Sequence, residues 1–471
     1  MNRTIPLILA VALFMENMDS TVISTSLPAI AADIETSPIA LKLALTAYLV
    51  ALAIFIPISA WMADRFGAKN VFRAAIAVFM IGSIGCAFSG SLAAFVVARF
   101  LQGMGGAMMT PVARLVLVRT SAKRNLVSAM AWLTIPGLIG PLVGPPVGGF
   151  ITTFVSWHWI FLINIPIGLA GLALATRFLP DMPPAGARPF DTAGFLLVAA
   201  AASGVVFGMS VVSLPALPPI VGVVTIMSGI AAGLIYLRHM RRCAEPVLDF
   251  SLFSNPVFRA SITGGSLFRL GNGATPFLLP LLLQIGFGLT PFQSGMLTFA
   301  SALGALAMKF LAPVTLRTGG FRTVLVASGL LAACLVAANG LFTQQTPYGV
   351  IVAVLLGAGF LRSLFFTASN ALVFADIDDK DAGQATAIAT SAQQVAIAIA
   401  VAIAGLILEA TMFFTGHGLG PADFSRAFFI MAAITALGVI PFWRMAADAG
   451  RAVSGHRIEN MAESEQPSKQ L

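Results

Sequence analysis

Three charged residues inside otherwise apolar segments have the types and spacing for proton chemistry. Glu16 and Asp19 lie three positions apart, hence on one face of a helix. If the first segment crosses a membrane from near Ile5, Asp19 lies about 21 Å along it, and Arg99 lies roughly 20 Å above the same side. The matching depths predict an Asp19–Arg99 pair. Relative movement of the two helices would switch the carboxyl group between loading and releasing a proton, whereas the alternative is a permanently ionised structural pair.

Positive charges inside apolar segments point to a second kind of site. Arg269 lies near the middle of its segment, and Arg362 lies toward one end of its own, without an evident acidic partner in that half of the chain. Cations that line a cavity favour an anionic substrate, whereas backbone carbonyls or interfaces can also neutralise them. Lys309 can extend its ammonium group to the membrane surface. The candidate substrate-binding residues are Gln102, Arg114, Arg269 and Arg362.

A run rich in glycine and proline occupies residues 133–149. Gly140, Gly144 and Gly148 recur every four residues and predict a flat stripe on which another helix packs closely. The prolines of the same run bend the helix, because they cannot donate backbone hydrogen bonds. A stripe of small residues alone would indicate only packing.

Other patterns argue against enzyme chemistry. The glycines of 103–107 lie inside an apolar segment with no preceding strand, so they do not predict a nucleotide loop. The four histidines are scattered, and Cys86, Cys243 and Cys334 lack paired spacing, which predicts neither a metal site nor a disulfide. We therefore expect no catalytic residue, no metal and no cofactor, with a proton gradient as the energy source.

The composition indicates an integral membrane protein. Of the 471 residues, 58% are hydrophobic and only 10% are charged, and the mean hydropathy is +0.93. The net charge of +8 is spread between apolar segments rather than gathered on a polar face, which argues against a nucleic-acid partner. The expected partner of most of the surface is the lipid bilayer.

About fourteen apolar segments are long enough to cross a bilayer, and an even number places both termini on one side. They cover residues 5–31, 43–63, 71–90, 92–116, 125–150, 157–177, 192–212, 219–238, 258–285, 293–315, 321–341, 348–374, 383–412 and 424–445. Alternate loops are rich in Lys and Arg, as at Lys69, Lys123 and Arg241, and this bias makes those loops and both termini cytoplasmic. The first segment is predicted to be an uncleaved helix in a bacterial inner membrane.

Two loops divide the segments into groups of six, two and six. One is the proline-rich loop of 179–189 and the other the basic loop of 238–259. A weak internal echo relates Asp64–Lys69 to Arg317–Arg322, as expected for a transporter built from repeats. The predicted parts are a six-helix bundle at 1–178, a linker with two extra helices at 179–245, a second six-helix bundle at 246–446 and a disordered tail at 447–471.

Four segments resemble motifs of the major facilitator superfamily, specifically of its fourteen-helix drug:proton antiporter branch, and the resemblance covers nearly the whole chain. They are Met18–Pro28, similar to the first-helix motif; Ala60–Lys69, similar to the loop motif between helices two and three; Arg99–Ala107, similar to the helix-four motif; and Gly140–Gly149, similar to the helix-five motif of antiporters. The loop motif has Ala60 where the family usually has glycine. Residues 156–168 also fit this branch.

The resemblance implies residue roles. Proton coupling falls to Asp19 and Arg99, with Glu16 beside them. The gating positions are Asp64, Arg65, Gly67 and Lys69, and the antiporter motif consists of Gly140, Gly144, Pro145, Gly148 and Gly149.

The resemblance also implies a fold and a function: an all-α membrane protein of two six-helix bundles and two inserted helices, a monomer that exports small amphipathic compounds of the multidrug type in exchange for protons. Two alternatives stay open, an exporter of a metabolic anion such as an organic acid or its metal chelate, and a membrane sensor without transport. Members of this branch that export cationic drugs tend to carry extra membrane acids in the second half, which this sequence lacks.

Overall fold

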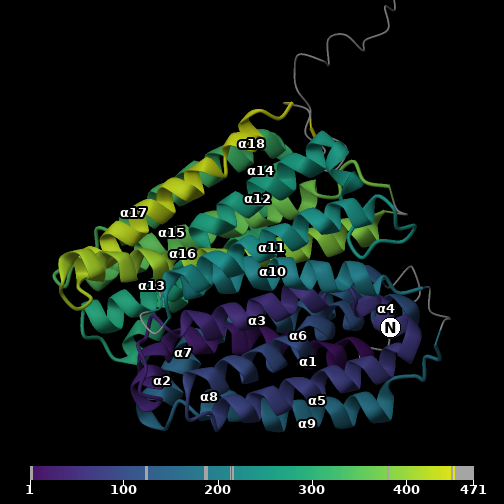
Figure 1. Cartoon of the computed structure of the whole chain (residues 1–471), viewed down its shortest axis with the longest axis horizontal. Helices are drawn as coiled ribbons and strands as arrows, with labels where there is room; N and C mark the ends of the chain where they lie inside the picture. Colours follow the sequence, from purple (N-terminus) through teal and green to yellow (C-terminus); the bar gives the residue numbers. More distant parts are fainter. Residues whose placement is uncertain are drawn as a thin grey trace, which may run out of the picture.

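The computed structural model is helical throughout the part that it describes, residues 4–121, 126–184, 189–212, 214, 217–378, 381–446 and 449–450. These residues form α-helices with short 3-10 and π turns and no strand, which confirms the all-α fold class. In Figure 1 the first half of the chain forms the lower part of the molecule and the second half the upper part. Most of the tail predicted at 447–471 lies outside the described residues.

Twelve helices within the described ranges are long and apolar enough to span a membrane, and the bent pair α3 (Lys42–Phe55) and α4 (Ser59–Phe66) brings the number to thirteen. The sequence predicted fourteen. The difference lies at 258–285, where the chain forms α12 (Pro256–Asn272), α13 (Thr275–Leu281) and the π turn η4 (Leu282–Gly286). Each piece is shorter than a span, because prolines at the start and inside α13 interrupt helical hydrogen bonding.

The first half packs around α1. This helix contacts α6, α7 and α9, while α5 packs along α6 and α9. The elements are α1 (Thr4–Val22), η1 (Ile23–Thr25), α2 (Leu27–Asp33), α3, α4, α5 (Ala68–Ala87), α6 (Leu92–Thr120), α7 (Leu126–Phe154), α8 (Trp159–Leu162) and α9 (Asn164–Phe178).

Two inserted helices, α10 (Thr192–Val211) and α11 (Pro219–Met240), pack as a pair. Their backbones approach closely at Gly204 and Gly229, where a Cβ built on Gly204 would lie 2.7 Å from the Gly229 Cα. In Figure 1 the pair lies between the halves, and α10 contacts α3 on one side and α16 on the other.

The second half contains η3 (Phe250–Ser254), α12, α13, η4, α14 (Pro291–Asn339), α15 (Tyr348–Leu372), α16 (Ala382–Thr415), α17 (Pro421–Leu437) and α18 (Ile440–Trp443). Helix α14 covers two spans, which meet at a break in the backbone at Gly320.

The structure supports the internal echo between the halves. Gly67 joins α4 to α5 with φ 84°, and Gly320 breaks α14 with φ 67°. Glycine adopts positive φ without the steric cost of a Cβ atom. The two predicted repeats therefore each have a glycine with positive φ at the corresponding connection between helices.

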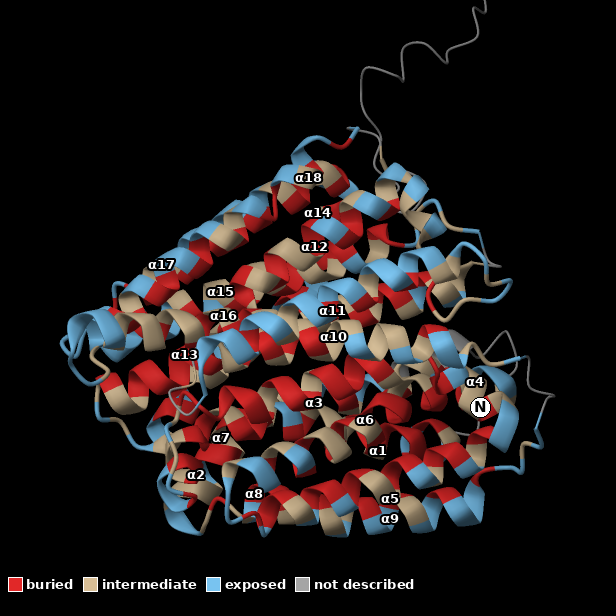
Figure 2. Ribbon diagram, in the orientation of Figure 1, coloured by how far each residue is buried: buried red, intermediate tan, exposed pale blue. Residues whose placement is uncertain are grey.

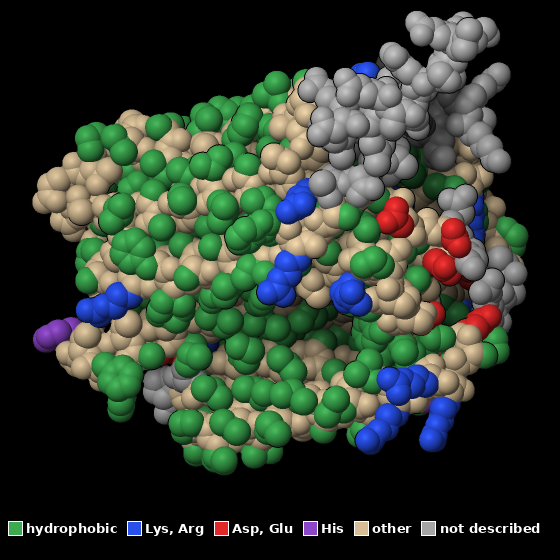
Figure 3. All heavy atoms as spheres, turned by 90° about the horizontal axis from the view of Figure 1, so that it is seen from above, with side chains coloured by type: hydrophobic (Ala, Val, Ile, Leu, Met, Phe, Trp, Pro, Cys, Tyr) green, Lys and Arg blue, Asp and Glu red, His purple; other side chains and the backbone are tan. Residues whose placement is uncertain are grey.

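The surface is that of a multi-pass membrane protein. Buried residues face the interior of the bundles, and exposed residues cover the outer faces of helices such as α11 and α17 (Figure 2). Many exposed side chains are large and apolar, including Phe310 at 78% and Trp443 at 67% exposure. Figure 3 shows this apolar covering, with acidic side chains gathered toward one end of the face. Such a surface requires lipid.

Candidate functional site

A buried ion pair forms the centre of the first half. Arg99 Nη1 on α6 donates to Asp19 Oδ2 on α1 at 2.7 Å, and both side chains are 1% exposed. The contact predicted from their depths is present. A charged pair removed from water in this way is costly unless hydrogen bonds satisfy its remaining atoms.

Neighbouring polar side chains supply those hydrogen bonds. The Asp19 Oδ1 atom accepts from Gln102 Nε2 and from Asn164 Nδ2, each at 2.8 Å. Gln102 Nε2 also donates to Ser83 Oγ at 2.8 Å, and its carbonyl oxygen accepts from Arg99 Nη1. Side chains of α6 and α9 thus bond the carboxylate on α1, and Ser83 of α5 joins the network through Gln102 and Asn164.

The cation of this cluster also has an aromatic contact. The Arg99 guanidinium carbon lies 4.3 Å from the centre of the Tyr48 ring on α3, a distance at which the ring face attracts a cation. Among the described residues, the Tyr48 hydroxyl and Arg99 Nε are buried without a hydrogen-bond partner.

Glu16 lies outside this cluster. One turn before Asp19 on α1, it accepts a hydrogen bond from Thr110 Oγ1 of α6 at 2.6 Å, and it is only partly buried. The two acids predicted on one face therefore have different surroundings: Asp19 is paired with a cation, and Glu16 is bonded to a hydroxyl group.

The glycine stripe of α7 packs on α1 next to Asp19. A Cβ on Gly140 would lie 2.9 Å from the Met18 amide nitrogen, one on Gly144 would overlap the Thr21 hydroxyl group, and one on Gly148 would lie 2.6 Å from the Val22 carbonyl oxygen. The adjoining Gly149 touches the Pro291 carbonyl at the start of α14 in the other half. Helix α7 therefore contacts both the helix of the acid and the opposite bundle.

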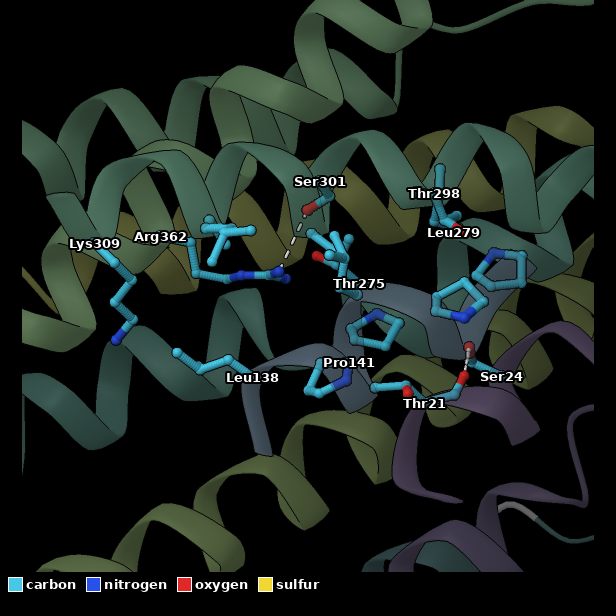
Figure 4. Close-up of a pocket in the computed structure, with 17 residues that line it drawn as sticks. Thr21, Ser24, Leu138, Pro141, Thr275, Leu279, Thr298, Ser301, Lys309 and Arg362 are labelled. Carbon is cyan, nitrogen blue, oxygen red and sulfur yellow. Dashed lines mark hydrogen bonds between the residues drawn. The ribbon is translucent and has the colours of Figure 1, made fainter. Parts of the chain in front are cut away.

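A cavity of about 200 Å³ lies between the halves. Its walls come from α1, α7, α13, α14 and α15. Figure 4 shows the hydroxyl groups of Thr21, Ser24 and Thr298 toward one end and the side chains of Lys309 and Arg362 toward the other. Most of the remaining wall is leucine, alanine and proline. Polar ends with an apolar middle suit an amphipathic molecule.

Of the four candidate substrate-binding residues, Arg362 lines this cavity. Gln102 lies in the buried cluster with Asp19. Arg269 donates to the Gly265 carbonyl and to Asn370 Oδ1, each at 3.0 Å, and its guanidinium lies 4.5 Å from the Phe366 ring centre. Neither Arg269 nor Arg114 lines the cavity.

Several polar contacts between the halves lie at the end of the molecule that the charge bias predicts to be external, and a further one, from Ser391 Oγ to the Ala53 carbonyl at 3.1 Å, lies deeper along α3 and α16. Lys42 at the start of α3 is completely buried and donates to Glu409 of α16 at 2.5 Å. Gln284 Nε2 donates to the Thr25 carbonyl at 2.9 Å, and the Phe292 amide donates to Thr153 Oγ1 at 3.1 Å. These contacts hold the two halves together at that end, which we call the closed end.

Comparisons with known proteins agree with the geometry. The sequence profile of the Major Facilitator Superfamily matches residues 9–400 and 261–463. This chain belongs to the major facilitator superfamily. Its members are transporters rather than enzymes, and this chain shares their helical membrane fold.

Similar curated relatives carry the name "Putative multidrug resistance protein MdtD". The protein from Pectobacterium carotovorum is 36% identical over 446 residues, which is 94% of this chain and 95% of the relative. That from Cronobacter sakazakii is 34% identical over 448 residues, 94% of each chain.

Solved structures of the superfamily are similar in fold at low sequence identity. A peptide transporter in complex with sulfate has a TM-score of 0.72 at 13% identity and covers 95% of both chains. A D-xylose–proton symporter has a TM-score of 0.70 at 15% identity and covers 95% of this chain and 98% of its own.

The superfamily's loop motif forms ion pairs within the first half. Asp64 pairs with Arg119 at the end of α6 at 2.6 Å, and Lys69 pairs with Asp181 beyond α9 at 2.8 Å. The hydrogen bond and the charge of Lys69 lower the pKa of Asp181. Gly67 is required for space as well as for its φ, because a Cβ there would lie 2.6 Å from the Met182 carbonyl oxygen. Arg65 is exposed.

Sequence reasoning missed several residues of the site. Ser83 and Asn164 were single polar residues in apolar segments, and Lys309 was interpreted as reaching the membrane surface, although it lines the cavity. Lys42 and Glu409 each lie near the end of an apolar segment on the side that the charge bias makes external, and comparing their depths would have predicted their contact.

The structure also gathers residues that looked scattered in sequence. His239 and Cys243 at the end of α11 and Asp191 at the start of α10 place potential ligand atoms within 4.8 Å of one another. His239 Nε2 lies 2.7 Å from Asp191 Oδ1. The pair ties the two inserted helices together at one end, which spacing along the chain did not reveal.

Proposed function

We propose that this protein exports small amphipathic compounds in exchange for protons, by alternating access, and that Asp19 carries the coupling proton. The observation that supports the proposal most is the buried Asp19–Arg99 pair, which four polar or aromatic side chains from four helices surround: Tyr48, Ser83, Gln102 and Asn164. An ionisable group at membrane depth is expensive and typically functional.

Helix α1 connects the proton site to the cavity. Asp19 faces the core of the first half, whereas Thr21 of the same helix and Ser24 of the following turn η1 line the cavity. Protonation of Asp19 removes the charge that attracts Arg99, so α1 and α6 lose their strongest contact. A shift of α1 then changes the cavity wall and, through the glycine stripe, the position of α7 against α14.

In this proposal the protein works as a monomer in a bacterial inner membrane, with both termini in the cytoplasm. The closed end is then external, and substrate enters from the cytoplasm. Single cysteines at Lys69 and Arg241 should resist an impermeant thiol reagent added to intact cells, whereas labelling at both would invert the orientation. Lys123, the third loop position predicted to be cytoplasmic, lies outside the described residues.

The central test is transport by reconstituted protein under an imposed pH gradient. One pH unit can support about a tenfold concentration ratio of a neutral substrate for each coupled proton. Asp19→Asn retains the size and most hydrogen-bonding capacity of the side chain but cannot release a proton. We expect wild type to concentrate substrate and Asp19→Asn to bring the ratio to one, while downhill exchange continues.

Glu16→Gln is the matched control, because it alters an acid one turn away on the same helix. It should retain gradient-driven accumulation. Accumulation by Asp19→Asn together with its loss in Glu16→Gln would assign the proton to the other acid. Wild type that moves no anionic, neutral or cationic compound would favour the sensor alternative.

A further inference from the structure

The charges of the cavity are all of one sign. Lys309 and Arg362 are its two ionisable lining residues, and none of the lining residues is an acid. The position of both side chains at one end of the cavity (Figure 4) gives that end a positive potential in surroundings of low dielectric constant.

Neither cation has a charged partner in the described part of the chain. Arg362 Nη2 donates to Ser301 Oγ at 3.3 Å, and Lys309 Nζ donates to Thr367 Oγ1 at 3.4 Å. Both bonds are long and end on neutral hydroxyl groups. A guanidinium group has five N–H donors in a planar fork, so Arg362 retains donors for a ligand.

Arg269 provides an internal comparison. It is also a cation inside the second half, but the protein supplies it with a carbonyl oxygen, an amide oxygen and an aromatic face. Arg362 and Lys309 each have one long hydrogen bond to a hydroxyl group and line the cavity. This is expected of groups whose main partner is a ligand.

The rest of the wall limits the shape of that ligand. Between the cations and the hydroxyl groups of Thr21 and Ser24, most of the lining is leucine, alanine and proline. The volume of about 200 Å³ is below the roughly 300–1,000 Å³ of pockets for drug-sized ligands. A small ring or short chain fills such a space.

We propose that the cavity binds a small amphipathic organic carboxylate, with the carboxylate on the Arg362 fork, Lys309 at its mouth and the apolar part against α7 and α13. Arg–carboxylate pairs are frequently bidentate, which fixes orientation as well as charge. This inference rests on the proposed export function and specifies its substrate class.

Equilibrium binding to purified wild type tests the charge preference without any gradient. The probes are benzoate, benzamide and benzamidine, which share one phenyl ring and nearly one shape but differ in charge. We expect benzoate to bind most tightly and benzamidine least. Equal binding of all three, or no detectable binding of benzoate, would overturn the carboxylate site.

Variants then assign the preference to residues. Arg362→Gln should weaken benzoate binding on the order of tenfold to a hundredfold, the value of a charge-assisted hydrogen bond, and leave benzamide unchanged. Arg362→Lys should retain part of the preference, and Lys309→Gln should have a smaller effect at the exposed mouth. Arg259→Gln, at an exposed arginine outside the cavity, is the control.

Equal loss of all three probes in Arg362→Gln, in protein that elutes as a single folded species, would mean that Arg362 supports the cavity rather than binds a carboxylate. Binding requires no proton transfer, so this result would leave the Asp19→Asn transport test unaffected. Failure of that transport test would in turn leave the binding result intact.

Discussion

The two halves of the molecule place opposite charges at equivalent positions. Asp19 lies three residues before the end of α1, the first helix of one half, and Arg269 lies three residues before the end of α12, the first long helix of the other. At the glycine joints, the residue three positions before Gly67 is Asp64, and the residue three positions before Gly320 is Arg317.

The surroundings of these charges differ as much as their signs. Asp19 has a cation and two amide groups as partners, so its negative charge is held until a proton neutralises it. Arg269 has neutral oxygen atoms and an aromatic ring, and an arginine does not titrate in the physiological range. In the proposed mechanism the first half therefore carries the charge that a proton neutralises, and the second half carries fixed charge. The predictions below test that division.

Removing Arg99 should have the largest effect. Arg99→Ala leaves Asp19 buried without its cation, which costs about 3–5 kcal/mol for a buried pair, and gradient-driven transport should be lost. Arg99→Lys should recover part of both. Thermal unfolding in detergent and transport in proteoliposomes measure the two effects. The double variant Asp19→Asn/Arg99→Gln should unfold at a higher temperature than Arg99→Ala yet stay uncoupled; restored coupling would refute the assignment of reversible charge to this pair.

Filling the glycine stripe should have the next largest effect, because α1 has to move against α7. Gly144→Val places methyl groups on the Thr21 hydroxyl and should cost about 1–3 kcal/mol of stability and slow exchange. Gly137→Ala is the control, since a Cβ there would make ordinary contacts, the nearest at 3.5 Å to Leu13. Unchanged exchange rates in folded Gly144→Val would show that this interface does not transmit the movement.

Arg269→Gln should have a moderate effect on stability and none on charge selectivity. Loss of its hydrogen bonds and of the Phe366 contact should cost about 1–3 kcal/mol. The ratio of benzoate to benzamide binding should stay at the wild-type value, in contrast to Arg362→Gln. A selective loss of benzoate binding would show that Arg269 contributes to substrate binding, and would contradict a purely structural role for its charge.

The smallest effect on stability is expected from Asp64→Ala. Its pair with Arg119 is more than one-third exposed, and exposed pairs contribute about 0–1 kcal/mol. Turnover should nevertheless fall more than affinity, because a loop charge far from the cavity alters the balance between conformations without touching substrate. Exchange rates and equilibrium binding on one preparation separate the two quantities. A weakened affinity at unchanged maximal rate would count against this role.

The fold and the Asp19–Arg99 contact were largely predictable from the sequence because both depend on order along the chain. Apolar length predicted most spans, and depth along two helices placed Asp19 opposite Arg99. The broken segment at 258–285 was missed because hydropathy does not register the backbone interruption around α13. The cavity was less accessible to prediction. Whether Lys309, Arg269 or Arg362 faces it depends on helix rotation, which packing rather than composition decides.

The Lys42–Glu409 contact has a consequence for the resting carrier. Gly405 leaves room for the Lys42 stem, so the ammonium group is buried in a socket formed by the opposite half. In the proposed alternating-access cycle, opening the end predicted to be external requires this group to be hydrated again each time. The contact therefore biases the empty protein toward one orientation, by tenfold for every 1.4 kcal/mol. It cannot set the direction of net flux, which the gradients determine. It affects instead the rate at which the protein without substrate changes orientation. That rate decides whether reorientation of the empty protein or of the substrate-bound protein limits turnover.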